Sequence, residues 1–435
     1  MFNILNEKKK QLDIHTLEVL KKSASSVLVK VIALLVGLLL SVALGRLLGP
    51  KGFGIINLAN RIVNILIIFG LLGVRQVLIR EIAIAHENGD YKTIGNMMNS
   101  SYLLNGGFTL ISSVFLILLA PWISINLFHQ PALTFPLIVF FLALTPQIFS
   151  RIYSSALVGY RKIWQSNLVE QALSIIITST ILLVIWLSGY EINVNLVAVL
   201  YAIGRISVAL TVGLYWHHLF GRGGPWESQP KKLFLRSKPL FLSTLSAIVI
   251  ANIDVVFLGF FTTAKDIGLY SAALNLALLT SFFLQIVSTA VGPKIAALYG
   301  RGNIEETQKM VRRITWSLIL ISVIPLFFFL GFGKILLNLW GDKFISAYGI
   351  LIVLSIGQFV NVATGVAGQV LIMTGNERVN TNIMIFFVIV DVLLSGLLIY
   401  KFGVIGAAIA NACIVIGLNV TKVILARAKT GISTI

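Results

Sequence analysis

Six ionisable residues stand inside long apolar stretches of this sequence: Lys30, Arg61, Glu170, Arg205, Asp254 and Asp391. A charge at the centre of a bilayer costs at least about 2.5 to 3.5 kcal/mol, so these side chains are expected to face a polar interior. Arginine binds phosphate groups through two parallel hydrogen bonds, and a buried carboxylate can take up a proton or a cation. The pattern therefore predicts a charged cavity that attracts an anionic substrate.

Neutral polar residues accompany these charges at helical spacing. Asn57, Arg61 and Asn64 lie at positions i, i+4 and i+7 and share one helix face. Asn275 belongs to a similar stripe in the second half of the chain. The predicted substrate-binding residues are Arg61, Arg205, Lys30, Asn57, Asn64 and Asn275, and the predicted coupling or counter-ion residues are Asp254, Asp391 and Glu170.

Simpler interpretations of the same residues stay open at this stage. Lys30 and Glu170 lie about 9 Å from the ends of their predicted helices, close enough for their side chains to extend to the membrane surface. Polar stripes also serve as hydrogen-bonded contacts between helices. Each carboxylate could instead simply neutralise an arginine.

The composition requires membrane-spanning helices to position these residues. Asp, Glu, Lys and Arg make up 11% of the 435 residues, whereas a soluble chain carries about 25%. Apolar stretches of about 20 residues recur, the length that crosses a bilayer core of about 30 Å. They predict about twelve transmembrane helices, at 24–45, 53–74, 100–122, 134–158, 165–187, 193–216, 239–261, 267–291, 314–336, 346–372, 381–400 and 403–425. Pro146 and Pro325 fall inside two of these segments, and proline can kink a spanning helix without ending it.

Basic residues concentrate in every second break between the segments. The chain has 34 Lys and Arg against 16 Asp and Glu, and the positive-inside rule places the basic breaks and both termini in the cytoplasm. The opposite breaks hold few basic residues, namely Arg46, Lys51, Lys265, Lys334, Lys343 and Lys401. A nucleic-acid interface would instead group its basic residues on one face. No nucleic-acid partner is therefore predicted.

A weak internal repeat relates the two halves of the sequence. At an offset of 214 residues, Leu44, Gly45, Lys51, Gly54 and Ala59 align with Leu258, Gly259, Lys265, Gly268 and Ala273. Because the offset spans six predicted helices, both copies have the same orientation, an arrangement in which transporters bind substrate between the halves. The prediction is an all-α polytopic membrane protein with two parallel six-helix repeats around a central cavity, at 1–216 and 239–435, joined by a cytoplasmic linker at 217–238.

Several short motifs carry a family resemblance that extends over most of the chain. The glycine-rich segment from Leu44 to Ile56 resembles the opening signature of Wzx-type polysaccharide biosynthesis flippases, which belong to the multidrug/oligosaccharidyl-lipid/polysaccharide exporter superfamily. Further points of resemblance are the basic start at 21–26, the segments 251–254 and 267–270, Gly375 with Asn376, and the segment 406–409.

The resemblance implies translocation of an undecaprenyl-pyrophosphate-linked oligosaccharide by alternating access across a bacterial cytoplasmic (inner) membrane. The cargo would be an O-antigen, capsule or exopolysaccharide repeat unit. By the same analogy Arg61 and Arg205 contact pyrophosphate or acidic sugar, with Lys30 secondary, while Asp254 and Asp391 are coupling or counter-ion positions. The implied partners are the lipid-linked oligosaccharide, the lipid bilayer and other polysaccharide assembly proteins.

Two other classes of function compete with a flippase. A cation-coupled multidrug exporter of the same superfamily is the nearest, although a cationic lumen suits organic cations poorly. A membrane glycosyltransferase or polymerase needs paired carboxylates in a sizeable outer loop, whereas the outer breaks hold only the isolated acids Glu191, Asp266 and Asp342. The single cysteine, Cys413, excludes a disulfide framework and a cysteine metal site. The sequence therefore predicts a transporter, with neither catalytic residues nor a cofactor or metal.

Overall fold

All regular elements in residues 2–221 and 227–434, the ranges that the computed structural model describes, are helices. Those of the first half are α1 (Phe2–Leu71), α2 (Val74–Glu87), α3 (Tyr91–Ser101), α4 (Gly107–Trp122), α5 (Thr134–Leu142), α6 (Leu144–Gly159), α7 (Ile163–Asn167), α8 (Leu173–Leu187) and α9 (Val194–Phe220). Those of the second half are α10 (Pro230–Phe261), α11 (Ala264–Leu278), α12 (Phe282–Gly300), α13 (Ile304–Asn338), α14 (Tyr348–Ala363), α15 (Ala367–Met373) and α16 (Glu377–Thr430). Short π and 3-10 turns η1 to η6 connect some of them.

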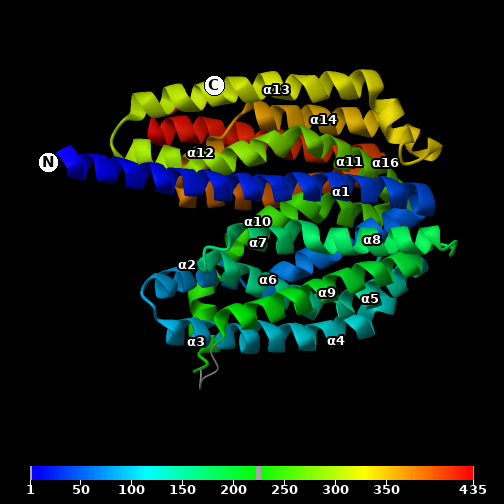
Figure 1. Cartoon of the computed structure of the whole chain (residues 1–435). Helices are drawn as coiled ribbons and strands as arrows, with labels where there is room; N and C mark the ends of the chain where they lie inside the picture. Colours follow the sequence, from blue (N-terminus) through cyan, green and yellow to red (C-terminus); the bar gives the residue numbers. More distant parts are fainter. Residues whose placement is uncertain (1, 222–226, 435) are drawn as a thin grey trace.

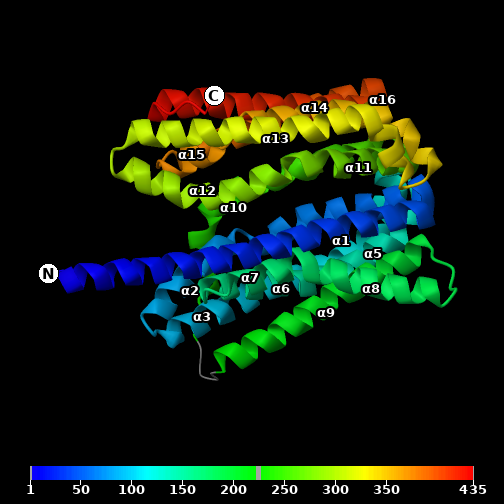
Figure 2. The same cartoon turned by 45° about the horizontal axis from the view of Figure 1, so that its top comes forward.

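Two of the longest helices are hairpins. Gly49 in α1 (φ 63°, ψ 179°) and Gly403 in α16 (φ 56°, ψ −133°) are not helical, and the chain reverses at each. Figure 2 shows the two arms of α1 running back past one another. In a straight helix Leu398 and Gly406 would be about 12 Å apart, because eight residues separate them. In α16 they are in contact, since a Cβ on Gly406 would lie 2.0 Å from the carbonyl oxygen of Leu398.

The membrane-spanning character of the chain is clear from its helices. Within the described residues nine helices are long and apolar enough to cross a membrane, or ten if the bent pair Pro131–Leu142 and Leu144–Gly159 is one span. The chain is therefore an all-α polytopic membrane protein. This number is below the predicted twelve because the hairpins α1 and α16 each count as one helix.

Proline affects the predicted spans in two ways. The fourth span bends by 42° at Ala143, just before Pro146, which has no backbone N–H to donate to the preceding turn. The ninth span continues through Pro325 as α13. The tenth, predicted as one segment, breaks between α14 and α15, where Gly365 has a φ of 68°.

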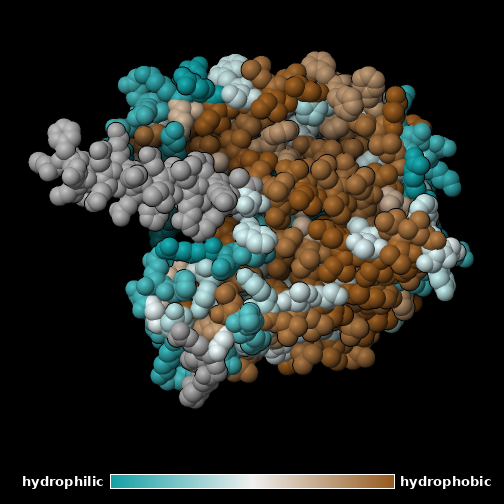
Figure 3. Space-filling view, in the orientation of Figure 1, coloured by the Kyte–Doolittle hydropathy of each residue, from teal (hydrophilic) through white to brown (hydrophobic). Residues whose placement is uncertain are grey.

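The two ends of the bundle differ in chemistry. We call the end where α1 begins, and where the turns after α2 and α12 lie, the basic end. The end with the Gly49 turn is the Gly49 end. In Figure 3 a broad apolar surface covers the middle of the molecule, with hydrophilic surface at both ends. This is the distribution expected of a protein embedded in a bilayer.

The first half of the chain (α1 to α9) and the second half (α10 to α16) lie side by side (Figure 1). Their main contacts are those of α1 with α10 and α11, and of α10 with α2 and α3. At the basic end, α12 and α15 pack on α13 and α16 of their own half. The halves are therefore joined most closely along α1, α10 and α11.

The halves approach closely at two equivalent glycines. A Cβ on Gly54 would lie 1.8 Å from the carbonyl oxygen of Ala264, and a Cβ on Gly268 would lie 2.0 Å from that of Pro50. Gly54 and Gly268, like Pro50 and Ala264, are 214 residues apart, the offset of the sequence repeat. The contact is therefore reciprocal, as in a two-fold symmetric interface.

Alanine at Gly54 or Gly268 is expected to weaken this contact, because the new methyl group meets a backbone oxygen. Overpacking of this kind costs about 1 to 3 kcal/mol. Gly331→Ala in α13 is the matched control, since no atom lies within 4 Å of its added Cβ. Thermal unfolding of the purified variants in detergent should show lower midpoints for Gly54→Ala and Gly268→Ala than for the control. Equal midpoints for all three would show that this contact does not hold the halves together.

Candidate functional site

A cavity of about 330 Å³ lies between the two halves, toward the basic end. The second arm of α1, α2 and α6 form one wall, and α10 forms the other. The lining residues are Asn64, Ile67, Ile68, Leu71, Gly73, Arg75, Gln76, Arg151, Thr244, Ile248 and Asn252. The cavity thus combines two arginines and several amides with apolar residues, a lining typical of ligand sites.

The two cavity arginines share one carboxylate. Arg75 donates to both oxygens of Glu170, at 2.7 and 2.8 Å, and Arg151 lies 3.5 Å from the same carboxylate. Ser154 also donates to Glu170, at 2.7 Å. The Glu170 side chain is only 10% exposed. Two guanidinium groups against one carboxylate leave one net positive charge at the cavity wall.

Local backbone irregularities position this cluster. Glu170 lies in the π-helical turn η4 (Leu168–Ala172) between α7 and α8, and such turns often occur at functional sites. Arg75 lies in the first turn of α2, directly after Leu72 and Gly73, which both have positive φ. A Cβ on Gly73 would lie 2.6 Å from the carbonyl oxygen of Ser237. Glycine therefore allows the start of α2 to pass close to α10.

Arg61 reaches from α1 across to the second half. Its guanidinium donates to the carbonyl oxygen of Ala251 at 3.0 Å and to Asn252 Oδ1 at 3.3 Å. Because Asn252 lines the cavity, Arg61 adds a second positive charge beside it. Of the other predicted residues on this arm, Asn64 lines the cavity, whereas Asn57 donates to the carbonyl oxygen of Phe53 in its own helix.

Arg205 is buried inside the first half and does not line the cavity. It donates to Asn60 Oδ1 and lies 4.4 Å from the centre of the Phe140 ring. Its Nη1 atom has no hydrogen-bond partner among the described residues. Lys30 is half-buried in α1, and within the described part of the chain it makes neither a hydrogen bond nor an ion pair. These two predicted substrate contacts therefore lie apart from the Arg75 cluster.

The two predicted coupling carboxylates are buried inside the second half. Asp254 accepts hydrogen bonds from the Tyr270 hydroxyl, from the backbone N–H of Val255 at 2.8 Å and from Asn411 at 3.3 Å. Asp391 accepts one from Ser395 at 2.8 Å. In the described ranges neither carboxylate forms an ion pair with Lys or Arg. Neither carboxylate lines the cavity, although Asp254 lies two residues from the cavity residue Asn252 in α10.

Aromatic side chains close the Gly49 end. Trp340 is fully buried against Gly45, where an added Cβ would lie 2.4 Å from the indole, and it donates to Ser41 Oγ at 3.0 Å. On the other side, Phe128 packs on Gly259, the repeat equivalent of Gly45, and stacks with Phe260 at 4.8 Å. We call Gly45, Gly259, Phe128 and Trp340 the clasp. Each half contributes one aromatic residue and one glycine to it.

The predicted residue Asn275 belongs to this clasp region rather than to the cavity. It donates to Ser41 Oγ at 2.9 Å, the same hydroxyl that accepts from Trp340. Together the clasp and the Gly54–Gly268 contact seal the halves at the Gly49 end. The cavity therefore lies on the side of the basic end.

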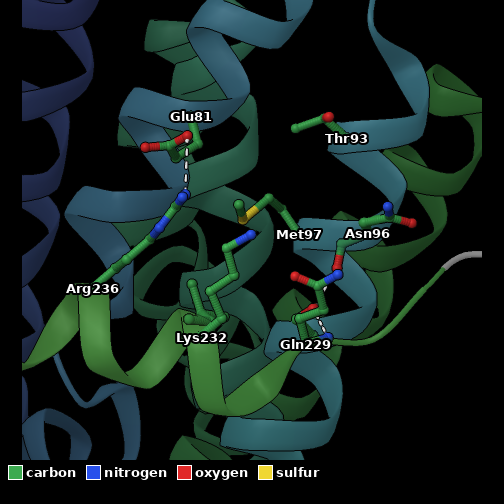
Figure 4. Close-up of a pocket in the computed structure, with 9 residues that line it drawn as sticks. Glu81, Thr93, Asn96, Met97, Gln229, Lys232 and Arg236 are labelled. Atoms are coloured by element: carbon green, nitrogen blue, oxygen red, sulfur yellow. Dashed lines mark hydrogen bonds and ion pairs between the residues drawn. The ribbon is translucent and has the colours of Figure 1, made fainter.

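The start of α10 is attached to the first half. The backbone N–H groups of Glu227 and Gln229 donate to Asn96 and Ser100 of α3, each at 2.8 Å. In Figure 4, Lys232 and Arg236 extend from α10 toward α2 and α3, and Arg236 pairs with Glu81 at 3.5 Å. The predicted linker at 217–238 is thus partly helical, because α9 continues to Phe220 and α10 begins at Pro230.

Arg75, Arg151 and Asn252 are site residues that the sequence pattern did not indicate. Arg75 directly follows the predicted span 53–74, as a basic loop residue would, and Arg151 lies near the end of the predicted span 134–158. Their place in the cavity depends on the bend at Leu72 and Gly73 and on the contact with Glu170. The signal available in the sequence was Gly73, two residues before Arg75.

The fold is similar to those of two membrane transporters of known structure. It superposes on an inward-facing multidrug resistance MATE family transporter of the MOP superfamily with a TM-score of 0.73, at 16% identity over 93% of this chain and 98% of that one. The lipid II flippase MurJ in an inward closed conformation gives a TM-score of 0.70, at 16% identity over 92% and 86%. At this level of identity the similarity concerns the fold alone.

Sequence comparison then defines the family. The model described as "Polysaccharide biosynthesis protein" matches residues 19–299, and the chain belongs to this family. The MatE model matches residues 239–397. The "Probable low-salt glycan biosynthesis flippase Agl15" of Haloferax volcanii is 29% identical over 43% of this chain and 40% of its own length. The family resemblance and the prediction of a transporter rather than an enzyme are confirmed.

Replacing Trp340 by Ala is expected to open the Gly49 end, because loss of a buried aromatic side chain costs about 3 to 5 kcal/mol. Ser271→Cys in a Cys413→Ser background supplies a single reporter thiol. Ser271 is buried in α11, four residues before Asn275. Modification of this thiol by a membrane-impermeant reagent should become at least about tenfold faster with Trp340→Ala. Trp122→Ala, which removes a largely exposed indole, should leave the rate unchanged. Equal rates in both variants would contradict the role of the clasp.

Proposed function

We propose that this protein is a flippase that moves a pyrophosphate-linked oligosaccharide on a lipid carrier across the membrane by alternating access. One observation carries the proposal: the cavity between the halves has excess positive charge, from Arg75, Arg151 and Arg61 against Glu170. Membership of the polysaccharide biosynthesis family supports a glycan cargo. Both MurJ and Agl15 carry the word flippase in their names.

The cavity chemistry suits a pyrophosphate head group. Arginine presents a planar fork of donors that matches phosphate oxygens in pairs. Such contacts strengthen where apolar neighbours exclude water, and Ile67, Ile68 and Leu71 supply that environment. An arriving anion would compete with Glu170 for Arg75 and Arg151. The shared carboxylate would then keep the two arginines oriented while the site is empty.

The proposed architecture is two parallel six-helix bundles. Counting the bent pair as one span and each arm of α1 and α16 separately gives twelve spans, six in each half. The reciprocal Gly54–Gly268 contact supports a pseudo-two-fold axis along the membrane normal. The bundles then correspond to 1–216 and 239–435, and the linker between them to 217–238.

The proposed orientation places the basic end and both termini in the cytoplasm of a bacterial cell. The distribution of Lys and Arg supports this orientation. The cavity in the described structure would then receive substrate from the cytoplasmic leaflet, with the clasp closed toward the outside. The cargo is proposed to be an O-antigen, capsule or exopolysaccharide repeat unit, with other assembly proteins as partners.

Asp254 and Asp391 are the proposed coupling residues. Both carboxylates are buried, at 2% and 3% exposure, and the side chains that hydrogen-bond to them are neutral. Burial of this kind favours uptake of a proton or a cation. Since Asp254 and the Arg61 partner Asn252 share one segment of α10, charge on Asp254 would act on the cavity wall. Arg205 remains a proposed contact for pyrophosphate or acidic sugar, with Lys30 as a secondary contact.

Arg61→Ala, Arg75→Ala and Asp254→Asn are each expected to reduce export at least about tenfold while leaving membrane insertion intact. Arg61 and Arg75 would lose contacts to the anionic head group, and Asp254→Asn would lose its titratable charge. Surface glycan and the leaflet distribution of the lipid-linked oligosaccharide, measured in a deletion host, are the readouts. Lys401→Ala, at an exposed site outside the cavity, is the control.

Normal export by all three variants at wild-type abundance would exclude the charged-cavity mechanism. Unchanged surface glycan with altered drug tolerance in the deletion host would indicate the multidrug exporter instead. Accumulation of an incomplete lipid-linked glycan in the deletion host would show that the protein acts in glycan synthesis and not in transport.

Single cysteines test the orientation. In a Cys413→Ser background, Glu191→Cys reports on the Gly49 end and Asn88→Cys on the basic end, both at exposed positions. A membrane-impermeant maleimide should label only Glu191→Cys in intact cells, and both after permeabilisation. The reverse pattern would invert the proposed topology.

A further inference from the structure

A second cavity, of about 490 Å³, opens on the membrane-facing side of the first half. It lies between the first arm of α1 and α8, and its lining is almost entirely apolar. The lining residues are Val36, Leu39, Leu40, Ala43, Arg46, Leu47, Ser179, Leu182, Leu183 and Trp186. We call it the α1–α8 groove. It is separate from the charged cavity, since the two share no lining residue.

The length of the groove matches one leaflet of a bilayer. From Val36 to Leu47 the helix rises about 16 Å, and half of a hydrocarbon core of about 30 Å is about 15 Å. Leu39 and Leu183 are 68% and 53% exposed, so the groove opens toward lipid. Trp186 at one end is of the residue type that favours the membrane interface.

The same end of the groove carries its one charged residue. Arg46 is exposed, three residues before the Gly49 turn, and its Nε donates to the carbonyl oxygen of Leu339 at 2.7 Å. Within the described residues its two terminal nitrogens have no partner. A guanidinium with free terminal N–H groups at the level of the head groups is a site for a phosphate oxygen.

We propose that the α1–α8 groove binds an anionic phospholipid of the leaflet at the Gly49 end, with one acyl chain between the two helices and the phosphate on Arg46. Two matches favour this occupant. The acyl chain of a phospholipid has the length of one leaflet, as the groove does, whereas a much longer polyprenyl chain would extend beyond it. The phosphate complements the only charge of the lining.

The bound lipid would stabilise the closed Gly49 end. Arg46 donates a hydrogen bond from Nε alone to the carbonyl oxygen of Leu339. Leu339 is the residue before the clasp residue Trp340. The phosphate can therefore bind the terminal nitrogens without displacing that contact. The opposite face of α1 carries Ser41 and Gly45, which contact Trp340. An acyl chain in the α1–α8 groove would support α1 from the side opposite to the clasp.

Photolabelling tests the site directly. The intact protein is placed in phosphatidylcholine nanodiscs containing a fifth, by moles, of phosphatidylglycerol with a photoactivatable diazirine on one acyl chain. Mass spectrometry should map the crosslinks to 36–47 and 179–186. Ala43→Phe, which fills the groove, and Arg46→Gln, which removes the phosphate ligand, should each reduce this labelling about tenfold. Leu187→Phe and Lys51→Gln, both at exposed positions outside the lining, should leave it unchanged.

Three results would overturn the proposal. Labelling that is equal in all four variants would mean that the probe reports only surrounding bulk lipid. An equally strong signal from a diazirine-labelled phosphatidylcholine would show that the phosphate of an anionic lipid is not selected. Displacement of the probe by stoichiometric polyprenyl phosphate, but not by excess unlabelled phosphatidylglycerol, would assign the groove to the carrier lipid. None of these readouts depends on transport.

Discussion

The structure depends on one constraint: the backbones of the two halves touch at Gly54 and Gly268. Each glycine packs against the chain of the other half, so closely that a methyl group would overlap a carbonyl oxygen. This contact fixes α1 against α11 and brings Gly45 and Gly259 within reach of Trp340 and Phe128. The seal at the Gly49 end follows from it, and so does the position of the charged cavity toward the basic end. The seal and the cavity, on which the proposed alternating-access mechanism depends, thus both follow from two residues without side chains.

Positive and negative buried charges are concentrated in different halves of this molecule. In the first half, the cavity arginines outnumber their shared carboxylate, and Arg205 is buried against an amide and an aromatic ring. In the second half, Asp254 and Asp391 are surrounded by hydroxyl and amide donors. Arg61 connects the two regions by binding the segment of α10 that precedes Asp254. An anion in the cavity and a cation or proton at Asp254 would therefore act on the same helix, α10.

The sequence indicated the helical membrane fold and the family, and its repeat offset of 214 residues relates the glycines that touch across the halves. It could not reveal the cavity cluster, because Arg75 and Arg151 lie at or near the ends of apolar stretches, where ordinary basic loop residues also lie. Only the bend at Leu72 and Gly73 brings Arg75 onto Glu170. Asn275 was expected in the cavity because helical spacing defines a face of α11 but not the neighbour that the face meets. The clasp aromatics lay in loops whose packing has no periodic signal.

Distances between spin labels would test the central claim, that a cavity at the basic end alternates with closure at the Gly49 end. Glu191→Cys paired with Lys343→Cys spans the Gly49 end, and Asn88→Cys paired with Arg301→Cys spans the basic end; all four positions are exposed. Pulsed electron–electron double resonance is recorded on the spin-labelled protein in nanodiscs, with and without polyprenyl-pyrophosphate oligosaccharide. The account predicts that substrate populates a state with a longer distance at the Gly49 end and a shorter one at the basic end. Distances that change in the same sense at both ends, or that do not change, would contradict it.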